Sequence, residues 1–403
     1  MRVTVSRSHC LDAMRMVAGL ISGRPSAGDI GRKPGPKKLV RLAVSRDGLQ
    51  IFGGEKEGFA TVFLPARMNE PYDSGCALVQ PWRLIEMLQN GKGEDVRFGV
   101  TLRDAVSVTM RDAKFEIESG DPDLFPLQIP SEIPLVATVY SSPLRQAMQR
   151  TVFTAGKDDP VLETFAFNVV CFDISSELWL CATDGGNLSL AKVADAKRPA
   201  ANAGRVSDLK LAVPRGSVAD LLSMVADELQ QVEIRSDDRL VSFSFNARGL
   251  AVQFYSSLVA RRMPAYRKVV PDLRGRACYV LKPAELRAAA SLIEPFSESG
   301  ADIHVTANTW RFEGQRANVG EGWHEIPVCG PDGIHSRLRL PPKMLERFAG
   351  SAPPESIEAL IGDAGEPLLF RSEGWTFVMM QCAEAPAPVA SPMHAYQPAA
   401  AAS

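Results

Sequence analysis

The residue types that most often carry out chemistry are scattered along this sequence. It has no G-x-S-x-G nucleophile elbow, no G-x-x-x-x-G-K-[ST] phosphate-binding loop and no G-x-G-x-x-G dinucleotide fingerprint. No two histidines stand at the H-x-x-x-H or H-E-x-x-H spacing that holds zinc on a helix. The sequence therefore predicts no catalytic residue, no metal site and no cofactor. The five histidines are His9, His304, His324, His335 and His394.

Aspartates are the remaining candidates for acid–base or metal chemistry. Asp158–Asp159 and Asp237–Asp238 are adjacent pairs. Neighbouring strand residues point to opposite faces, and both pairs stand in turn-like sequence, so we interpret them as turn residues. Asp184 precedes two glycines, and we interpret it as an aspartate that caps its own turn rather than as a catalytic acid.

Composition indicates an ordinary globular protein of several domains. The chain has 403 residues, which suggests two to four domains, with 45% apolar and 23% charged residues. There is no apolar run long enough to span a membrane, and the first residues alternate like a strand rather than a signal peptide. The seven cysteines never form a C-x-x-C pair, which predicts reduced thiols in a cytoplasmic protein. The net charge of −2 excludes only a protein that is positive over its whole surface.

Six short amphipathic helices can be placed at intervals of roughly 60 to 75 residues, each followed by alternating, strand-like segments. Five of them carry a proline at or near the start, where its missing N–H costs nothing. Together with the three central segments described next, this pattern predicts an α+β protein made of six βαβββ units. The alternative is a large α+β protein whose helices happen to be evenly spaced. The helices are expected to begin near Ser8, Gln80, Ser142, Pro214, Lys282 and Pro341.

Three segments in the middle of the chain are the most specific signals. Leu180–Leu188 reads as a strand that runs into an Asp-Gly-Gly turn, Val213–Leu222 as a helix opened by Pro214, and Arg262–Pro271 as a basic connector interrupted by prolines. In this order and spacing they resemble the middle domain of the bacterial DNA polymerase III β subunit family, the sliding clamps. That family has an Ala-Thr-Asp-Gly turn, an Ile/Val-Pro-Arg/Lys helix start and a Pro-x-Tyr-Arg-Arg/Lys-Val connector.

The resemblance implies a fold and its boundaries. It implies three similar domains of the DNA clamp fold, each built from two βαβββ units, with helices lining a ring and antiparallel sheets outside. We expect the domains to span 1–133, 134–273 and 274–382. The segment 383–403 is rich in alanine and proline and lacks periodicity, so we expect a disordered tail, which is a departure from the family.

The resemblance also implies a function without catalysis. A clamp is a homodimeric ring and processivity factor that encircles duplex DNA without sequence preference. It tethers DNA polymerase III, is handled by a clamp loader and binds the clamp-motif peptides of other DNA-processing proteins, in the cytoplasm at the nucleoid. Two alternatives stay open: a clamp paralogue for repair, plasmid or phage replication, and an α+β nucleic-acid-processing or metabolic enzyme. The sequence does not decide between two and three chains per ring.

Three residue sets follow from the same resemblance. The first would bind partner peptides: Leu162, Thr183, Gly185, Leu188, Pro264, Lys268, Val269, Val378, Met379 and Met380. The second would contact DNA phosphates: Arg24, Arg83, Arg145, Arg150 and Arg215. The third would close the dimer: Phe115, Ile117, Leu292 and Ile293.

The chain departs from the family's pattern in two places. Gly186 and Asn187 replace the family's His-Arg after the Asp-Gly, and Gln381 and Cys382 stand where the family has Pro and an apolar residue. These changes predict weaker peptide binding than is usual in the family.

Overall fold

The computed structural model describes residues 1–22, 38–55, 57–66, 74–101, 105–128, 132–156, 165–199, 209–226, 228–298, 300–333, 335–363 and 365–382. The predictions for Arg24, Leu162, Asp158, Asp159 and the tail 383–403 fall outside these residues.

One strand, one helix and three strands form a unit that recurs six times in the described residues. The first two units are β1 (Arg2–Ser6), α1 (Arg7–Gly19), β2 (Val40–Ser45), β3 (Gly48–Gly54), β4 (Gly58–Pro65), β5 (Gly75–Val79), α2 (Pro81–Asn90), β6 (Asp95–Val100), β7 (Ala105–Thr109) and β8 (Lys114–Glu118). The middle two are β9 (Leu135–Tyr140), α3 (Ser141–Val152), β10 (Val169–Ile174), β11 (Leu178–Thr183), β12 (Asn187–Val193), β13 (Leu209–Pro214), α4 (Arg215–Met224), β14 (Gln231–Ser236), β15 (Leu240–Ala247) and β16 (Leu250–Ser257). The last two are β17 (Ala277–Leu281), α5 (Pro283–Ile293), β18 (Ala301–Val305), β19 (Thr309–Arg316), β20 (Gly320–Pro327), β21 (Ser336–Leu340), α6 (Pro342–Ser351), β22 (Ile357–Ile361), β23 (Leu368–Ser372) and β24 (Trp375–Met379).

The α+β fold class and the repeated βαβββ unit are confirmed, and the helices begin where the prolines predicted. Pro81, Pro283 and Pro342 are the first residues of α2, α5 and α6. At this position proline supplies a helical φ and removes only an N–H that would have no intrahelical partner. Each helix buries one stripe of apolar side chains, as Leu84 and Leu88 do in α2.

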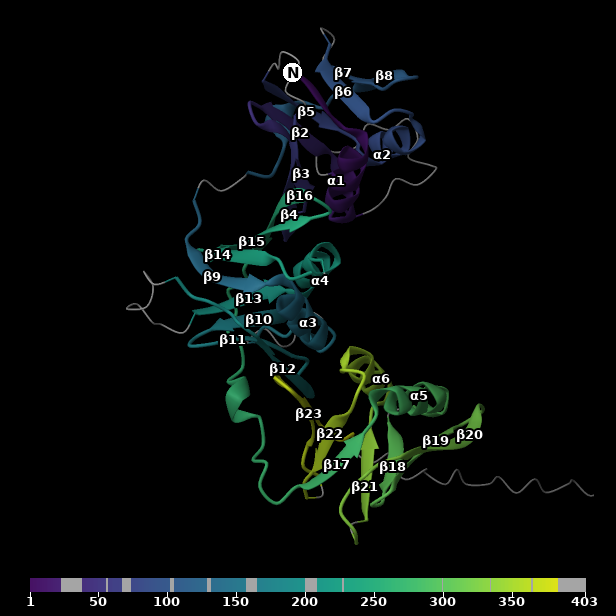
Figure 1. Ribbon diagram of the computed structural model, residues 1–403. Helices are drawn as coiled ribbons and strands as arrows, with labels where there is room; N and C mark the ends of the chain where they lie inside the picture. The colour runs from purple at the N-terminus through teal and green to yellow at the C-terminus, as the bar shows by residue number, and fades with distance from the viewer. Residues whose placement is uncertain are drawn as a thin grey trace, which may run out of the picture. The chain divides into compact units, whose positions relative to one another are not determined.

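Neighbouring units exchange their first strands. β1 pairs with β6 of the second unit, while β5 pairs with β2 of the first unit. The same exchange joins β9 to β14 and β10 to β13, and then β17 to β22 and β18 to β21. All these pairs are antiparallel, and the two helices of each exchanged pair pack on one another, as α1 and α2 do in Figure 1. The exchange interlocks the six units into three similar pairs.

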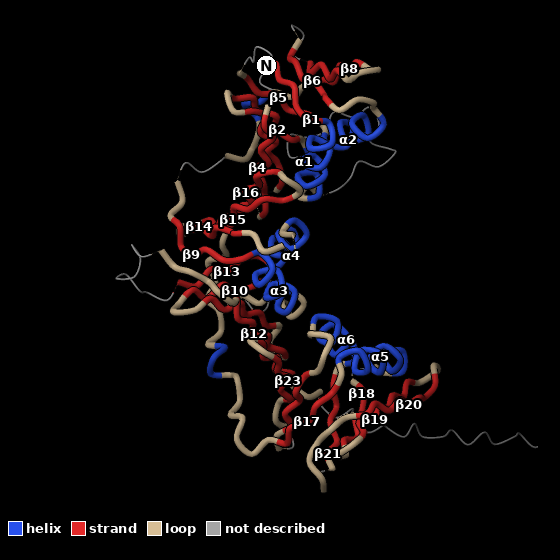
Figure 2. The backbone as a smooth tube through the Cα atoms, in the orientation of Figure 1, coloured by secondary structure: helices blue, strands red, loops and turns tan. Residues whose placement is uncertain are grey.

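A continuous sheet joins the first interlocked pair to the second. Its strand order is β5-β2-β3-β4-β16-β15-β14-β9, and the joint is the antiparallel pairing of β4 with β16 (Figure 2). Side chains reinforce the joint: the rings of Phe59 and Tyr255 stack with centroids 4.9 Å apart. The Glu57 carbonyl accepts hydrogen bonds from the Ser217 hydroxyl at 2.8 Å and the Ser256 hydroxyl at 3.0 Å.

The chain forms two compact units. One contains residues 1–272 and 371–378, and the other contains 273–370 and the chain from Met379 onward. Within the compact unit of residues 1–272 and 371–378, β24 follows β12 in the sheet order β13-β10-β11-β12-β24. No helix in the described ranges is long and apolar enough to cross a membrane.

A carboxylate on α4 lies in an unfavourable position beside the β4–β16 joint. An added Cβ at Gly58 would lie 3.6 Å from an Asp220 carboxylate oxygen, so this side chain faces the start of β4. Burial raises the pKa of Asp220 to about 6, and repulsion from Glu55 adds to the shift. The folded state therefore disfavours the charged form of Asp220.

We predict that Asp220→Asn stabilises the protein at neutral pH. The folded pKa lies above the unfolded one, so the stabilisation by the protonated form is complete below about pH 4 and is lost as the pH rises through about 6. After discounting for solvent screening, the variant should gain roughly 1 kcal/mol in unfolding free energy at pH 7.5 and almost nothing at pH 4. Urea unfolding at the two pH values measures this difference. Glu86→Gln, on the exposed face of α2, is the control; an Asp220→Asn protein less stable than wild type at pH 7.5 would contradict the interpretation.

Candidate functional site

The Asp-Gly-Gly turn between β11 and β12 is held by its own side chains. The Asp184 carboxylate accepts hydrogen bonds from the backbone N–H groups of Gly186 at 3.0 Å and Asn187 at 2.6 Å. The Thr183 hydroxyl donates to the Asn187 carbonyl at 2.6 Å, and Gly185 adopts a φ of +93°, which favours glycine. The interpretation of Asp184 as a turn-capping residue is confirmed, because its carboxylate is occupied by the turn.

Thr183 and Leu188 lie opposite one another on the sheet face that points away from α3. They are paired residues of β11 and β12. Ser189 hydrogen-bonds to the Arg150 carbonyl of α3, so by alternation Leu188 points to the other face. Leu188 is only 3% exposed and Thr183 only 7% exposed. Both side chains can therefore form the floor of a groove but not its rim.

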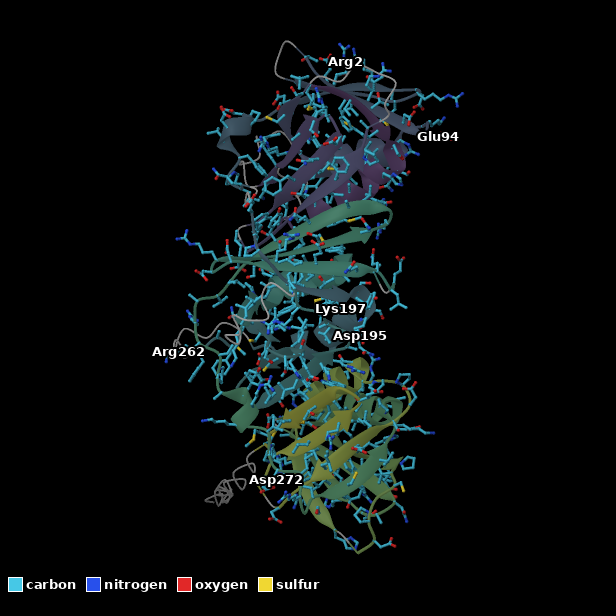
Figure 3. The ribbon with its side chains drawn as sticks, turned by 60° about the vertical axis from the view of Figure 1, so that its left-hand side comes forward. Arg2, Glu94, Asp195, Lys197, Arg262 and Asp272 are labelled. Atoms are coloured by element: carbon cyan, nitrogen blue, oxygen red, sulfur yellow. The ribbon has the colours of Figure 1, made fainter. Side chains whose placement is uncertain are left out.

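The connector after β16 lies over this same outer face. Its Val259 and Met263 pack on Ala166, Val169 and Ala212. The Val259 N–H donates to the Ala212 carbonyl at 2.9 Å, which fixes the start of the connector on β13. Figure 3 labels Arg262 and Asp272, and the connector segment between them contains Tyr266, Lys268 and Val269.

One tyrosine fastens the middle of the connector. Tyr266 begins a short 3₁₀ turn, Tyr266–Lys268, and is 2% exposed. Its hydroxyl donates to the buried Asp173 carboxylate of β10, and the Arg267 guanidinium donates to the same oxygen at 3.1 Å. Lys210 and Arg267 each place their charged group within 6 Å of the Tyr266 ring centre, at 5.6 and 5.7 Å. Burial raises the pKa of Tyr266, and the hydrogen bond to Asp173 adds to this, so the hydroxyl stays protonated.

The predicted peptide-binding residues of the connector are accessible. Lys268 is exposed, Val269 is 55% exposed, and Pro264 is half-buried. Sequence reasoning identified these residues but missed Asp173, which holds the turn that carries them. A signal was present: Asp173 is the single charge within the apolar strand segment Val169–Ile174, where an unpaired carboxylate would be costly.

The last strand divides the predicted residues between two faces. The Trp375 indole N–H donates to the Ser189 hydroxyl at 2.8 Å, and the Phe377 ring lies 5.6 Å from that of Phe153, so Trp375 and Phe377 face α3. Alternation places Met379 on that face as well, whereas Val378 and Met380 point the other way. Met379 is fully buried and Met380 is 46% exposed. Met379 therefore lies in the core on the α3 side of the sheet, on the opposite face from Val378.

Two arginines predicted to contact DNA make contacts within the protein. Arg150 is 7% exposed, its guanidinium lies 5.3 Å from the Trp375 ring centre, and burial lowers its pKa. Arg145 donates to the carbonyls of Leu222 and Val225 at the carboxyl end of α4, where a cation complements the helix dipole. The burial of Arg150 contradicts the prediction that it contacts DNA, because protein covers its charge. The DNA contact of Arg145, whose side chain is half-buried, stays a prediction.

The other helix cations are more accessible. Arg83 is exposed on α2, and Arg215 is half-buried at the first position of α4. Further exposed cations stand on α1, α5 and α6: Arg15, Arg287, Lys343 and Arg347.

The four residues predicted to close the dimer differ in exposure. Leu292, near the end of α5, is 55% exposed, and Phe115 of β8 is half-buried. Ile117 and Ile293 are 6% and 2% exposed, so both belong to the core of their domain. Only Leu292 and Phe115 present substantial apolar surface.

Two buried cysteines and the metal-ligating residue types were the remaining side chains with possible reactivity. Cys171 and Cys181 are directly opposite on β10 and β11, and burial raises the pKa of Cys171 to about 12, so both are protonated thiols. Within the described ranges, no group of three or more His, Cys, Asp or Glu side chains is placed to hold a metal ion. The arrangement around the connector is suited to binding through apolar and charged contacts.

We predict that Arg150→Ala destabilises the protein, because Arg150 has a structural role. The change removes a cation–π contact and the guanidinium's hydrogen bond to the Glu373 carbonyl at 3.3 Å, and it leaves a cavity between α3 and β24. The loss of unfolding free energy should be about 2 kcal/mol, measured by urea unfolding. Arg83→Ala, an exposed arginine on another helix, should change stability little. An Arg150→Ala protein of wild-type stability would show that Arg150 does not have this structural role.

Comparisons with known proteins agree with this fold. No family model matches the sequence. The β sliding clamp of Salmonella typhimurium is 24% identical over 317 residues, which cover 76% of this chain and 79% of the relative. The crystal structure of the DNA polymerase III β subunit of Pseudomonas aeruginosa has a TM-score of 0.82 at 19% identity, covering 94% of this chain and 99% of that chain. A P. aeruginosa sliding clamp bound to griselimycin has a TM-score of 0.80 at 19% identity, with the same coverage of 94% and 99%. In sequence over about three quarters of the chain, and in fold over nearly all of it, this chain is similar to DNA polymerase III β subunits, the β sliding clamps.

Proposed function

We propose that this chain is a DNA sliding clamp, a non-enzymatic processivity factor that closes into a homodimeric ring around duplex DNA. In this role it tethers DNA polymerase III and other DNA-processing proteins, and it acts in the cytoplasm at the nucleoid. The likeness to clamps supports the role itself. The encirclement of DNA and the binding of partners are the parts that the following observations support.

The observation that best supports a ring is the pairing of the fourth strand of each βαβββ unit. Fourth strands meet in pairs: β4 pairs with β16, and β12 is the neighbour of β24. The two that are left, β8 and β20, lie at the edges of four-stranded sheets with no further strand beside them in the described part of the chain. An open edge exposes unpaired N–H and C=O groups, which favours pairing with another chain. A head-to-tail contact of β8 with β20 of a second copy would satisfy both edges and repeat until the ring closes.

Apolar surface beside these two edges supports the same contact. Phe115 lies on β8 itself. Beside β20, Phe296 packs against Gly314 and Gly322, with a ring carbon 3.5 Å from where a Cβ at Gly322 would stand. Leu292 precedes Phe296 by one helical turn and is 55% exposed. Pairing of the edges would bury this apolar surface together with the backbone groups.

A few helix cations support a loose, sequence-independent contact with DNA. Arg83, Lys343 and Arg347 are exposed on helices, whereas Arg145 and Arg150 are used inside the protein. Few phosphate contacts fit a protein with a net charge of −2 and give weak, salt-sensitive binding. Such a protein holds DNA by enclosing it rather than by gripping it.

The connector and β12 support a groove for partner peptides. Val269 provides exposed apolar surface, Lys268 provides a charge, and Leu188 provides a buried floor. Aliphatic side chains suit the leucine and phenylalanine anchors of an extended peptide. The P. aeruginosa clamp of the same fold has been crystallised with griselimycin bound.

We predict that Leu292→Asp converts the wild-type dimer into folded monomers. The change places a charge in the apolar contact beside β20 without touching the buried Ile293, so the domain should stay folded. Sedimentation velocity measures the outcome. Leu229→Asp, at a leucine that is 81% exposed in a loop before β14, is the control and should remain dimeric. A Leu292→Asp protein that sediments like wild type would show that the interface lies elsewhere.

We predict that Val269→Asp weakens the binding of a Gln-x-x-Leu-x-Phe peptide by at least tenfold. A carboxylate in an apolar contact loses hydration without gaining a partner, and loss of a central contact commonly costs about 1–3 kcal/mol. Fluorescence anisotropy with a labelled peptide measures the affinity, and Leu229→Asp again serves as the control. Equal affinities for Val269→Asp and wild type would show that Val269 does not contact the peptide. No binding to wild type at high micromolar peptide would show that the chain has no such groove.

A further inference from the structure

We propose that Asp173 and Tyr266 are positioning residues for partner binding: they form a latch that holds the exposed turn Arg267–Val269 in its binding conformation. This inference rests on the proposed peptide-binding function, and it assigns a role to two residues that lie outside the predicted groove. The latch is defined as the Tyr266 hydroxyl, the Asp173 carboxylate and the Arg267 guanidinium.

Within the residues that the structure describes, the latch is the buried attachment of this turn. Tyr266 is 2% exposed, but the three residues that follow it are all exposed, Val269 by 55%. Apart from the latch, the hydrogen bonds of the turn to the described residues are short-range, from Lys268 N–H to the Ala265 carbonyl at 2.9 Å and from Val269 N–H to the Tyr266 carbonyl at 3.0 Å. Without the latch, the turn would depend on these local bonds, which are weak in an exposed segment.

The latch has a physical cost that a purely apolar contact would avoid. Asp173 is 1% exposed, and its Oδ1 finds no hydrogen-bond partner among the described residues. Burying a carboxylate with one unsatisfied oxygen is unfavourable, and an apolar pair of similar shape would be at least as stable. The polar pair instead fixes an orientation. The hydrogen bond holds the Tyr266 hydroxyl in one position, which orients the ring and the turn that follows it.

Charges around the ring fix its orientation further. Lys210, from β13, and Arg267, from the turn, place their charged groups 5.6 and 5.7 Å from the Tyr266 ring centre. Arg267 is thus bound twice, through Asp173 and through the ring. The adjacent Lys268 and Val269 leave this anchored point toward solvent, where a peptide can reach them. A pre-ordered turn binds more tightly because the entropy of ordering it is not lost on binding.

The decisive experiment compares Tyr266→Phe and Asp173→Ala with wild type in two measurements on the full chain. The first is amide hydrogen exchange without peptide. Both variants should speed exchange at Lys268 and Val269 by about tenfold, because losing one buried hydrogen bond to a charged group is worth this order of free energy. The second is anisotropy with the labelled Gln-x-x-Leu-x-Phe peptide, where both variants should bind about tenfold more weakly.

Three further variants separate positioning from general stability. Asp173→Asn keeps an oxygen that can accept from Tyr266 and should restore both exchange and affinity to within about twofold of wild type. The double variant Tyr266→Phe/Asp173→Ala should be no worse than either single variant, since the two residues form one contact. Tyr255→Phe removes the hydroxyl of another buried tyrosine, 1% exposed, and should leave both measurements unchanged.

The outcomes that would overturn the latch differ from those that would overturn the groove. Unchanged exchange at Lys268 and Val269 in Tyr266→Phe would contradict the latch directly, without any reference to a peptide. Faster exchange with unchanged peptide affinity would contradict its role in positioning. An absence of peptide binding to wild type, by contrast, would overturn the proposed groove, and with it the positioning role of the latch, whatever the exchange rates are.

Discussion

The pairing of fourth strands is the constraint on which the rest of this structure depends. A strand at the edge of a sheet leaves its N–H and C=O groups without partners, and proteins pair, cover or charge such edges. This chain pairs β4 with β16 and sets β24 beside β12. The exchange of first strands places a first strand at one edge of each group of four strands and a fourth strand at the other, and in the described part of the chain β8 and β20 are the fourth strands that meet no other fourth strand. The proposed ring would pair β8 of one chain with β20 of the next.

The distribution of charge fits a protein that encloses its ligand. Positive residues on helices are not uniformly available, since Arg145 binds the end of α4 and Arg150 stacks on Trp375. The exposed cations on the described α-helices are Arg15, Arg83, Arg287, Lys343 and Arg347, and the chain as a whole is slightly acidic. Tight binding through phosphate neutralisation needs many cations, whereas a closed ring needs only enough of them to make its inner wall compatible with DNA. In the proposed ring, retention would come from topology, and sliding would cost little because no base would be read.

Much of the fold could be predicted because its signals are local. A proline at a helix start, a period of apolar residues and an Asp-Gly-Gly turn are each set by a few neighbouring residues, and the helix starts at Pro81, Pro283 and Pro342 and the Asp184 cap were correct. The errors concern contacts between distant segments. Arg150 has the position of a surface arginine on α3, but its partner Trp375 comes from the other end of the chain. Met379 differs from Val378 only in strand register, which a motif does not reveal. Asp173 escaped notice because its meaning depends on Tyr266, far along the sequence.

The most direct test of encirclement measures whether the protein stays on circular DNA and leaves when the same DNA is made linear. The chain would be loaded by a bacterial clamp loader onto nicked circular duplex DNA and then washed in about 1 M salt, where contacts between exposed charges are screened. The fraction bound would be measured before and after a restriction enzyme linearises the DNA. The account predicts that the protein stays on the circle in high salt and leaves once the DNA has ends. Loss from the intact circle under this wash, or persistence on the linear product, would contradict it.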